Sequence, residues 1–131
     1  MSKIVIIGAG AMGSAFALPC LDNNHDVNIV GTHLENDFID NLKTNKNLHA
    51  GLKTKIPQEI KIFKFEEFVQ ILKSNVDLIV LGVSSKGIEW VADQLSKIYS
   101  RKQIPNLLML TKGLSIHKNN YELLVDKLKR L

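Results

Sequence analysis

Three glycines that follow a short apolar run near the start of the chain constrain its fold more than any other feature. Residues 4–7 are Ile-Val-Ile-Ile, and Gly8, Gly10 and Gly13 come next. An unbroken run of β-branched residues predicts a strand that is buried on both faces of a sheet. In a strand–turn–helix of this type, the first glycine permits the tight turn and the second lets a pyrophosphate approach the backbone. The third glycine allows the helix to pack closely on the strand.

A helix that starts after these glycines directs its free N–H groups and the positive end of its dipole at an anion. We expect this helix over residues 14–23, with a bend at Pro19, because proline lacks the N–H that a helical hydrogen bond requires. A glycine-rich turn without a ligand is the alternative interpretation. The predicted pyrophosphate-binding residues are Gly8, Gly10, Ala11, Met12 and Gly13.

Predicted strands and helices alternate along the rest of the chain. Further strands are expected at residues 27–30, 60–63, 77–83 and 106–110. Helices are expected at residues 35–42, 65–73, 87–99 and 121–131, and an irregular loop at residues 44–58. This alternation predicts an α/β fold, a Rossmann-type doubly wound parallel sheet of about five strands with right-handed crossovers. We expect residues 1–131 to form one dinucleotide-binding domain.

Three of the predicted strands end in polar or glycine-containing triplets. These triplets are Gly31-Thr32-His33, Ser84-Ser85-Lys86 and Thr111-Lys112-Gly113. Ligands of parallel α/β sheets bind beyond the carboxyl ends of the strands, which all lie at one edge of the sheet. We therefore expect the three triplets to lie at the same edge as the glycines.

Thr32 and His33 follow the second strand, where folds of this kind contact the adenine ribose. A carboxylate at this place binds the 2′-hydroxyl of NAD, and none precedes Glu35. The cofactor is therefore predicted to be NADP or NAD, with a slight preference for NADP. Thr32 also fits the start of the next helix, where Glu35 would complete a capping box, and one residue can serve both purposes.

Ser84 and Lys112 follow the fourth and fifth predicted strands. The Lys112 ammonium would lie at the ligand edge, where it could bind a substrate oxygen or a phosphate; an ordinary surface lysine is the alternative. Ser84 either lines the nicotinamide half of the cofactor or caps the helix that begins near Gly87.

Composition excludes several function classes. The single Cys20 cannot form an internal disulfide and is expected to be a buried structural thiol. His25, His49 and His117 lack the spacing of metal ligands and are expected to be solvated, so no metal site is predicted. The net charge of +4, without basic runs interleaved with aromatic residues, argues against nucleic-acid binding. No stretch reaches the roughly 18 apolar residues of a membrane span, and a reducing cytoplasm is the expected location.

Several short stretches of the chain resemble the N-terminal half of glycerol-3-phosphate dehydrogenases, and archaeal-type sequences are the most similar. The stretches occur in the family's order and extend over nearly the whole chain: residues 8–15, 19, 23–27, 31–32, 49–53, 81–84 and 110–114.

The resemblance implies an enzyme that interconverts dihydroxyacetone phosphate and sn-glycerol 3-phosphate with a nicotinamide cofactor. It places the pyrophosphate at the glycine loop, Thr32 and His33 beside the adenine ribose, and Lys112 at the substrate near the nicotinamide. The family continues with a helical C-terminal domain that supplies a catalytic lysine and the contacts to the substrate phosphate. The matching stretches do not include that domain, so we expect either a truncated product or a second half on another polypeptide, or a homodimer, and negligible dihydroxyacetone phosphate reduction by these residues alone.

Two alternatives remain at this point. Ketopantoate reductases open with a similar glycine run, but an Asn-Gly pair tends to stand where this chain has Lys112-Gly113. Nucleotide-sensing modules that regulate ion transporters have a similar length, but they usually carry an acidic residue after the second strand.

Overall fold

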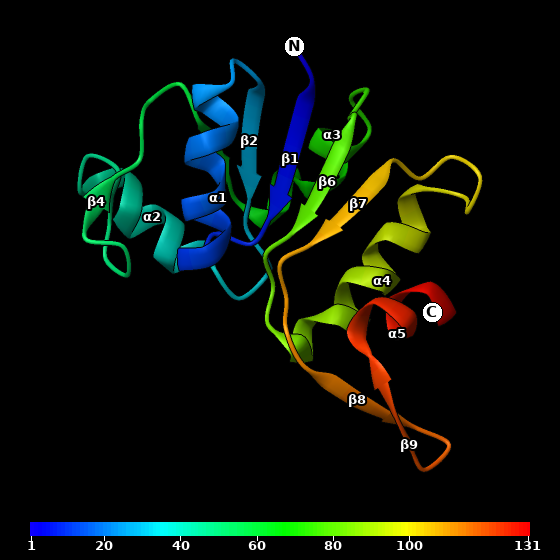
Figure 1. The fold of residues 1–131 in the computed structure, drawn as a ribbon. Coiled ribbons are helices and arrows are strands. Elements are labelled where there is room, and N and C mark those ends of the chain that lie inside the picture. Colours follow the sequence, from blue (N-terminus) through cyan, green and yellow to red (C-terminus); the bar gives the residue numbers. More distant parts are fainter.

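Five parallel strands form the central sheet of the computed structural model, which describes residues 1–131 (Figure 1). Their order across the sheet is β5-β2-β1-β6-β7, with Ile7 of β1 in register with Val30 of β2 and with Leu81 of β6. This is the strand order of the doubly wound dinucleotide-binding fold without a sixth strand. The predicted parallel α/β sheet is therefore confirmed. The strands are β1 Lys3–Ile7, β2 Asp26–Val30, β5 Lys61–Phe63, β6 Leu78–Leu81 and β7 Asn106–Met109.

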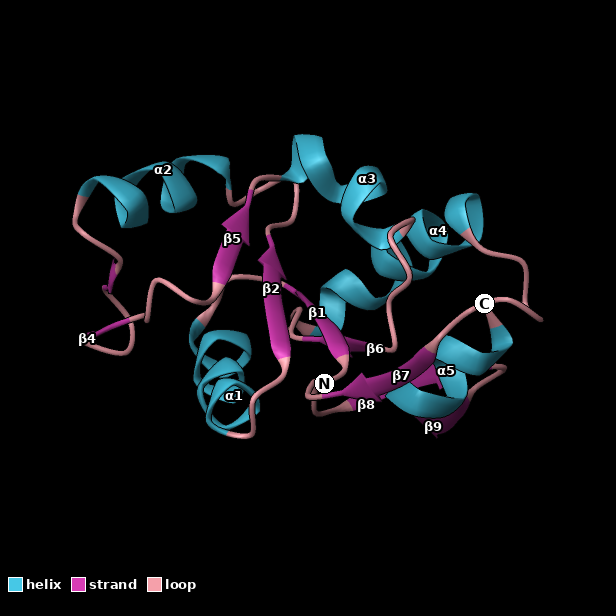
Figure 2. Cartoon of the chain, turned by 90° about the horizontal axis from the view of Figure 1, so that it is seen from above, coloured by secondary structure: helices cyan, strands magenta, loops and turns pink.

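Helices cover both faces of the sheet (Figure 2). One apolar core joins the sheet to α1 and α2, and a second core joins the opposite face to α3 and α4. The predicted helix over residues 65–73 is a 3₁₀ turn, η1, followed by the short α3, and a second 3₁₀ turn, η2, precedes α4. The bounds are α1 Ala11–Asp22, α2 Asn36–Thr44, η1 Phe65–Glu67, α3 Phe68–Leu72, η2 Ser85–Gly87, α4 Ile88–Ile98 and α5 Leu124–Arg130.

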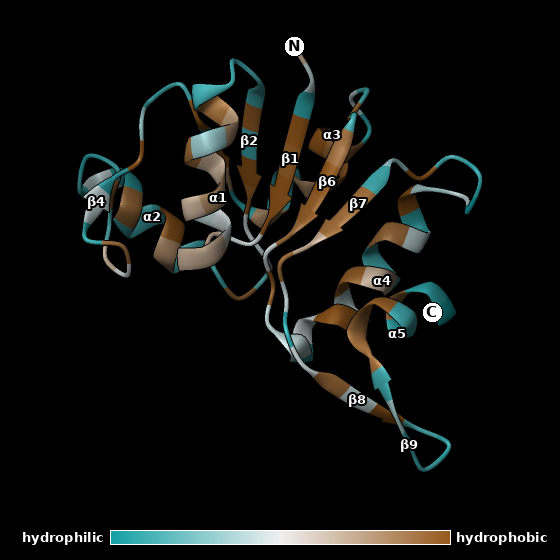
Figure 3. Ribbon diagram, viewed as in Figure 1, coloured by the Kyte–Doolittle hydropathy of each residue, from teal (hydrophilic) through white to brown (hydrophobic).

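Strand β1 is apolar from Ile4 to Ile7 because it lies between two neighbouring strands and beneath helices on both faces (Figure 3). Ile4 and Ile6 belong to the core of α1 and α2, whereas Val5 and Ile7 belong to the core of α3 and α4. Successive side chains of a strand point to opposite faces, so an unbroken apolar run satisfies both cores. Cys20 of α1 is buried as expected, and this burial raises the pKa of its thiol.

Helix α1 begins three residues earlier than the sequence predicted. Gly10 is extended and takes the N-cap position, and the Ser14 N–H donates to the Gly10 carbonyl at 3.0 Å. Ala11 and Met12 therefore belong to the first turn of the helix. The helix continues through Pro19.

The segment that was expected to be an irregular loop contains a small antiparallel hairpin. Its strands are β3, Leu48–His49, and β4, Thr54–Lys55. The expectation that His49 is solvated is wrong, because only 2% of this residue is exposed. Its ring nitrogens bind backbone groups of the protein, as described below, and these bonds replace those to water.

The predicted helix over residues 121–131 is wrong at its start. A hairpin of β8, Leu114–His117, and β9, Asn120–Leu123, comes before the short α5. Lys118 and Asn119 connect its strands, with φ angles of 48° and 65°. Two consecutive positive φ angles are those of a type I′ turn, which fits the twist of a hairpin. None of the helices combines the length and the apolar character that a membrane span requires.

Candidate functional site

The loop between β1 and α1 is packed so closely that two of its glycines leave no room for a side chain. Gly8 has a φ of +110°, and a Cβ on it would lie 2.7 Å from the Gly82 carbonyl oxygen. A Cβ on Gly13 would lie 2.7 Å from the Gly8 carbonyl oxygen. The loop is therefore fixed against the end of β6 and against the first turn of α1.

Gly10 differs from these two glycines because open space lies beside it. A Cβ on Gly10 would meet no heavy atom within 4 Å. No side chain caps the N-terminus of α1 at this point, and no acidic residue lies in its first turn. Free N–H groups and the positive end of the helix dipole thus face a space that a Cβ would begin to fill. This arrangement fits the pyrophosphate of a dinucleotide.

A cavity of about 340 Å³ lies directly against this helix N-terminus. Its walls come from the glycine loop, from the segment that follows β6 and from the segment that follows β7. The Thr111 hydroxyl donates to the Val83 carbonyl at 2.5 Å and ties the last two segments together. The lining residues are Gly10, Ala11, Met12, Gly82, Val83, Ser84, Ser85, Leu110, Thr111 and Lys112.

The cavity brings Ser84 and Lys112 to the glycine loop although they are far apart in the sequence. Lys112 is exposed, and none of the ion pairs of the structure includes it. Ser84 stands at the N-cap position of η2, yet its side chain makes no capping hydrogen bond. Both polar groups are therefore available to a molecule in the cavity.

Glu35 holds its carboxylate against the outer side of the glycine loop. It accepts the Ala9 N–H at 3.1 Å and the Thr32 N–H at 2.9 Å. The expected capping box is only half formed, since the Thr32 hydroxyl accepts the Leu34 N–H at 3.4 Å and α2 begins after Glu35. Sequence reasoning assigned Glu35 to helix capping alone and missed its contact with the loop after β1.

His33 lies at the same edge of the sheet, with its ring turned towards an aromatic cluster. The ring centroid is 4.8 Å from that of Trp90 and 6.0 Å from that of Phe65. Phe65 also lies 5.6 Å from Trp90. Rings of this kind offer flat apolar faces on which a base can stack.

His49 fixes the backbone of the glycine loop from the other side. Its Nε2 lies 2.9 Å from the Ala9 carbonyl oxygen, and its Nδ1 accepts the N–H groups of Gly51 and Leu52 at 3.1 Å each. Because Nδ1 accepts, Nε2 carries the proton and donates to Ala9. The hairpin of β3 and β4 is thereby attached to the loop. The sequence offered no local signal for this contact.

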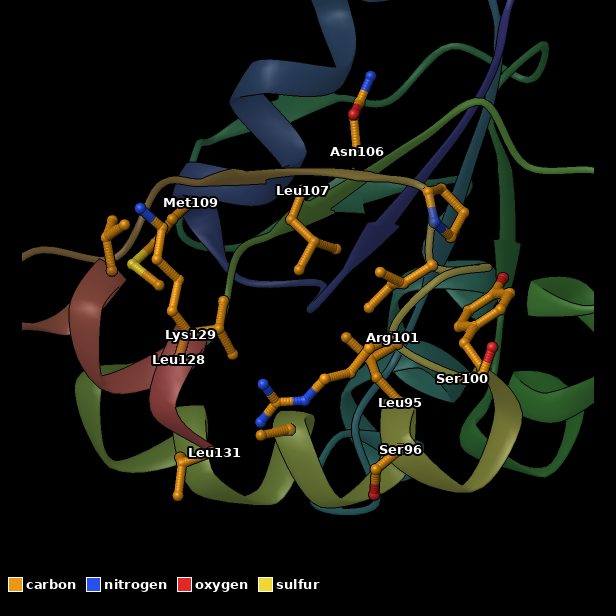
Figure 4. Close-up of a pocket in the computed structure, with 15 residues that line it drawn as sticks. Leu95, Ser96, Ser100, Arg101, Asn106, Leu107, Met109, Leu128, Lys129 and Leu131 are labelled. Atoms are coloured by element: carbon orange, nitrogen blue, oxygen red, sulfur yellow. The ribbon is translucent and has the colours of Figure 1, made fainter.

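A second cavity, of about 540 Å³, lies elsewhere, between the edge strand β7, α4 and α5 (Figure 4). Its lining is mostly hydrophobic and includes Leu95, Leu107, Met109 and Leu128. It includes none of the glycine-loop residues. The smaller cavity is therefore the candidate site.

The strand order, the glycine loop and the uncapped helix define a dinucleotide-binding domain of the Rossmann class. Within this class, residues 3–130 match the family described as NAD-dependent glycerol-3-phosphate dehydrogenase N-terminus, and the chain belongs to that family. This match favours the resemblance found in the sequence over both alternatives.

Curated relatives of the chain are glycerol-3-phosphate dehydrogenases. The NADP(+)-dependent glycerol-3-phosphate dehydrogenase of Archaeoglobus fulgidus is 32% identical over 111 residues, which cover 85% of this chain and 31% of the relative. A glycerol-3-phosphate dehydrogenase [NAD(P)+] of Shouchella clausii is 30% identical over 131 residues, which cover 97% of this chain and 36% of the relative. The chain thus spans about a third of the length of these relatives.

A solved structure of Plasmodium falciparum glycerol-3-phosphate dehydrogenase shares the fold. The TM-score is 0.76 at 21% identity, over 98% of this chain and 37% of that one.

Proposed function

We propose that residues 1–131 form one cofactor-binding unit, the part of an NAD(P)-dependent sn-glycerol-3-phosphate dehydrogenase that holds the nicotinamide dinucleotide. The observation that supports this most strongly is the cavity that joins Gly10, Ala11 and Met12 to Ser84 and Lys112. The complete enzyme would interconvert dihydroxyacetone phosphate and sn-glycerol 3-phosphate. We place this reaction in the cytoplasm.

The backbone N–H groups of Ala11 and Met12 would hold the pyrophosphate beside Gly10, where no side chain interferes. Thr32 and His33 would lie beside the adenine ribose, and Ser84 would line the nicotinamide half. The nicotinamide supplies or accepts the hydride when the cofactor is bound. This chain's own contribution is to orient the cofactor at the carboxyl ends of the strands.

Lys112 would donate a hydrogen bond from its ammonium to the carbonyl or phosphate oxygen of the substrate. A charge-assisted bond of this kind is worth about 1.5–3 kcal/mol. Reduction of the carbonyl also needs a proton donor at its oxygen and a shielded site. We propose that these and the contacts to the substrate phosphate come from polypeptide equivalent to the remaining two thirds of the relatives.

Titration of the isolated chain with NADH and NADPH, followed by nicotinamide fluorescence, tests the proposed cofactor. Binding without turnover is expected, and the proposal fails if neither coenzyme binds below about millimolar concentration. Dihydroxyacetone phosphate is then added to the NADH complex. We expect Lys112→Met to weaken its binding at least about tenfold, which is the lower end of what one charge-assisted bond is worth.

Lys118→Met, in the turn of the distal hairpin, removes an equivalent charge and should leave this affinity unchanged. Equal affinities in both variants would eliminate Lys112 as a substrate contact, while the cofactor result would stand by itself.

A further inference from the structure

The carboxylate of Glu35 is held in place by backbone groups from the loops that follow two neighbouring strands. The Ala9 N–H, after β1, lies 3.1 Å from both carboxylate oxygens, and the Thr32 N–H, after β2, lies 2.9 Å from Oε1. Glu35 is half-buried. A carboxylate with two backbone donors keeps one position at the carboxyl ends of β1 and β2.

This position decides which ribose can bind next to it. An ionised carboxylate accepts about four hydrogen bonds, so Glu35 retains acceptor capacity after binding the two N–H groups. The unmodified 2′- and 3′-hydroxyls of an adenosine ribose can donate to it. A 2′-phosphate offers no such donor when ionised, and it brings a charge of about −1.5 to −2 beside the carboxylate.

No arginine is placed to offset that charge. Sites that accept a 2′-phosphate commonly use a nearby arginine, and this chain has arginine only at positions 101 and 130. Arg101 lines the distant cavity beside β7, and Arg130 pairs with Glu122 at 2.6 Å. Lys64, which follows β5, pairs with Asp40 at 3.1 Å. The His33 ring packs on Trp90.

We infer that Glu35 selects the cofactor of this site, binding the ribose diol of NAD(H) and repelling the 2′-phosphate of NADP(H). The inference rests on the proposed function, because it assumes that a nicotinamide dinucleotide occupies the glycine loop. The inferred preference for NAD(H) is the reverse of the slight preference for NADP that was predicted from Thr32 and His33. Glu35 lies in the turn before α2, two residues beyond His33.

The wild-type chain tests the inference directly through its affinities for NADH and NADPH. We expect NADH to bind at least about tenfold more tightly. Adenosine 5′-monophosphate and adenosine 2′,5′-bisphosphate test the same contact without the nicotinamide. Trp90, the only tryptophan of the chain, reports their binding by its fluorescence, because its ring lies 4.8 Å from that of His33. The monophosphate should bind more tightly.

Glu35→Gln then distinguishes the effect of the carboxylate's charge from its structural role in binding the two loops. Its amide oxygen can still accept the Ala9 and Thr32 N–H groups, so a purely structural role predicts equal changes for both coenzymes. We expect instead that the affinity ratio falls to within about threefold, mainly because NADPH binds more tightly. Asp37→Asn, which removes an exposed carboxylate from the first turn of α2, should leave the ratio unchanged.

Equal affinities of the wild type for NADH and NADPH overturn the inference, as does a ratio that Glu35→Gln does not alter. If NADH and NADPH both fail to bind, the proposed function itself fails. The wild-type measurement keeps the inference testable even if Glu35→Gln does not fold, which circular dichroism would show.

Discussion

The first βαβ unit and the last hairpin contain similar apolar side chains, yet the protein buries one set and exposes the other. Ile4, Val5, Ile6 and Ile7 of β1 are at most 4% exposed. In the hairpin of β8 and β9, Ile116 and Tyr121 are paired in register but are 70% and 79% exposed. Figure 1 shows this hairpin extending beyond the carboxyl ends of the sheet.

The comparison shows that an apolar strand stabilises the protein only where neighbouring strands and helices cover it. The type of side chain alone does not decide this. Strand β1 has a neighbour on each side and helices on both faces, whereas the hairpin consists of two strands followed by α5. An isolated hairpin is marginally stable in water, and segments with few buried contacts open locally at low free energy. The candidate site contains residues from both regions, because Gly10 belongs to the first βαβ unit and Lys112 lies directly before the hairpin.

The largest effect is expected from a side chain placed inside the rigid region. Gly13→Ala would put a Cβ 2.7 Å from the Gly8 carbonyl oxygen, so the loop must shift, and we expect a loss of about 3 kcal/mol in the free energy of unfolding. Gly10→Ala, whose Cβ meets open space, should change stability by less than about 1 kcal/mol. Urea denaturation measures both variants, and a similar loss in both would contradict the packing described for the loop.

Gly10→Ala also separates stability from binding. Its methyl group would enter the space assigned to the pyrophosphate, so NADH affinity should fall about tenfold or more. Unchanged affinity would place the pyrophosphate elsewhere.

An intermediate effect is expected from the buried histidine that joins the β3–β4 hairpin to the glycine loop. His49→Leu leaves the Gly51 and Leu52 N–H groups without this acceptor, whereas the Ala9 carbonyl keeps the Ser14 hydroxyl at 3.1 Å. The loss should cost about 2–3 kcal/mol. His117→Leu in the distal hairpin breaks no such network and should cost less than about 0.5 kcal/mol. Thermal denaturation of the two variants compares the regions directly, and equal costs would show that His49 does not stabilise the loop.

The smallest effect is expected in the distal hairpin. Ile116→Lys replaces a side chain that is already 70% exposed, so the free energy of unfolding should change by less than about 0.5 kcal/mol. Hydrogen exchange should be faster at the amides of β8 and β9 than at those of β1. Protection of the hairpin equal to that of β1 would mean that the hairpin is covered in solution.

Much of the fold and part of the candidate site follow from local patterns. The unbroken apolar run of residues 4–7 marks the central strand, and the spacing of Gly8, Gly10 and Gly13 marks the turn that follows it. Alternating strands and helices require a parallel sheet, whose strands all end at one edge. The meeting of Ser84 and Lys112 with the glycine loop was predictable for this reason.

Other features had no local signal. His49 is one polar residue in a polar segment, and its burial depends on the Ala9 carbonyl, 40 residues away in the chain. Glu35 occupies a position that suits a helix cap, and only the tertiary structure shows that its carboxylate also binds the Ala9 N–H. The turn at Lys118 and Asn119 lacks the glycine that usually marks a type I′ turn.

By itself, the sequence determined the parallel sheet, the glycine loop and the edge at which a dinucleotide would bind, because periodicity and glycine spacing act over a few residues. The tertiary structure alone decided that two distant side chains meet at Ala9, where Glu35 accepts its N–H and His49 donates to its carbonyl. It also decided that the hairpin after Lys112 stays exposed. These outcomes depend on hydrogen bonds and coverage between distant segments, which no local pattern specifies.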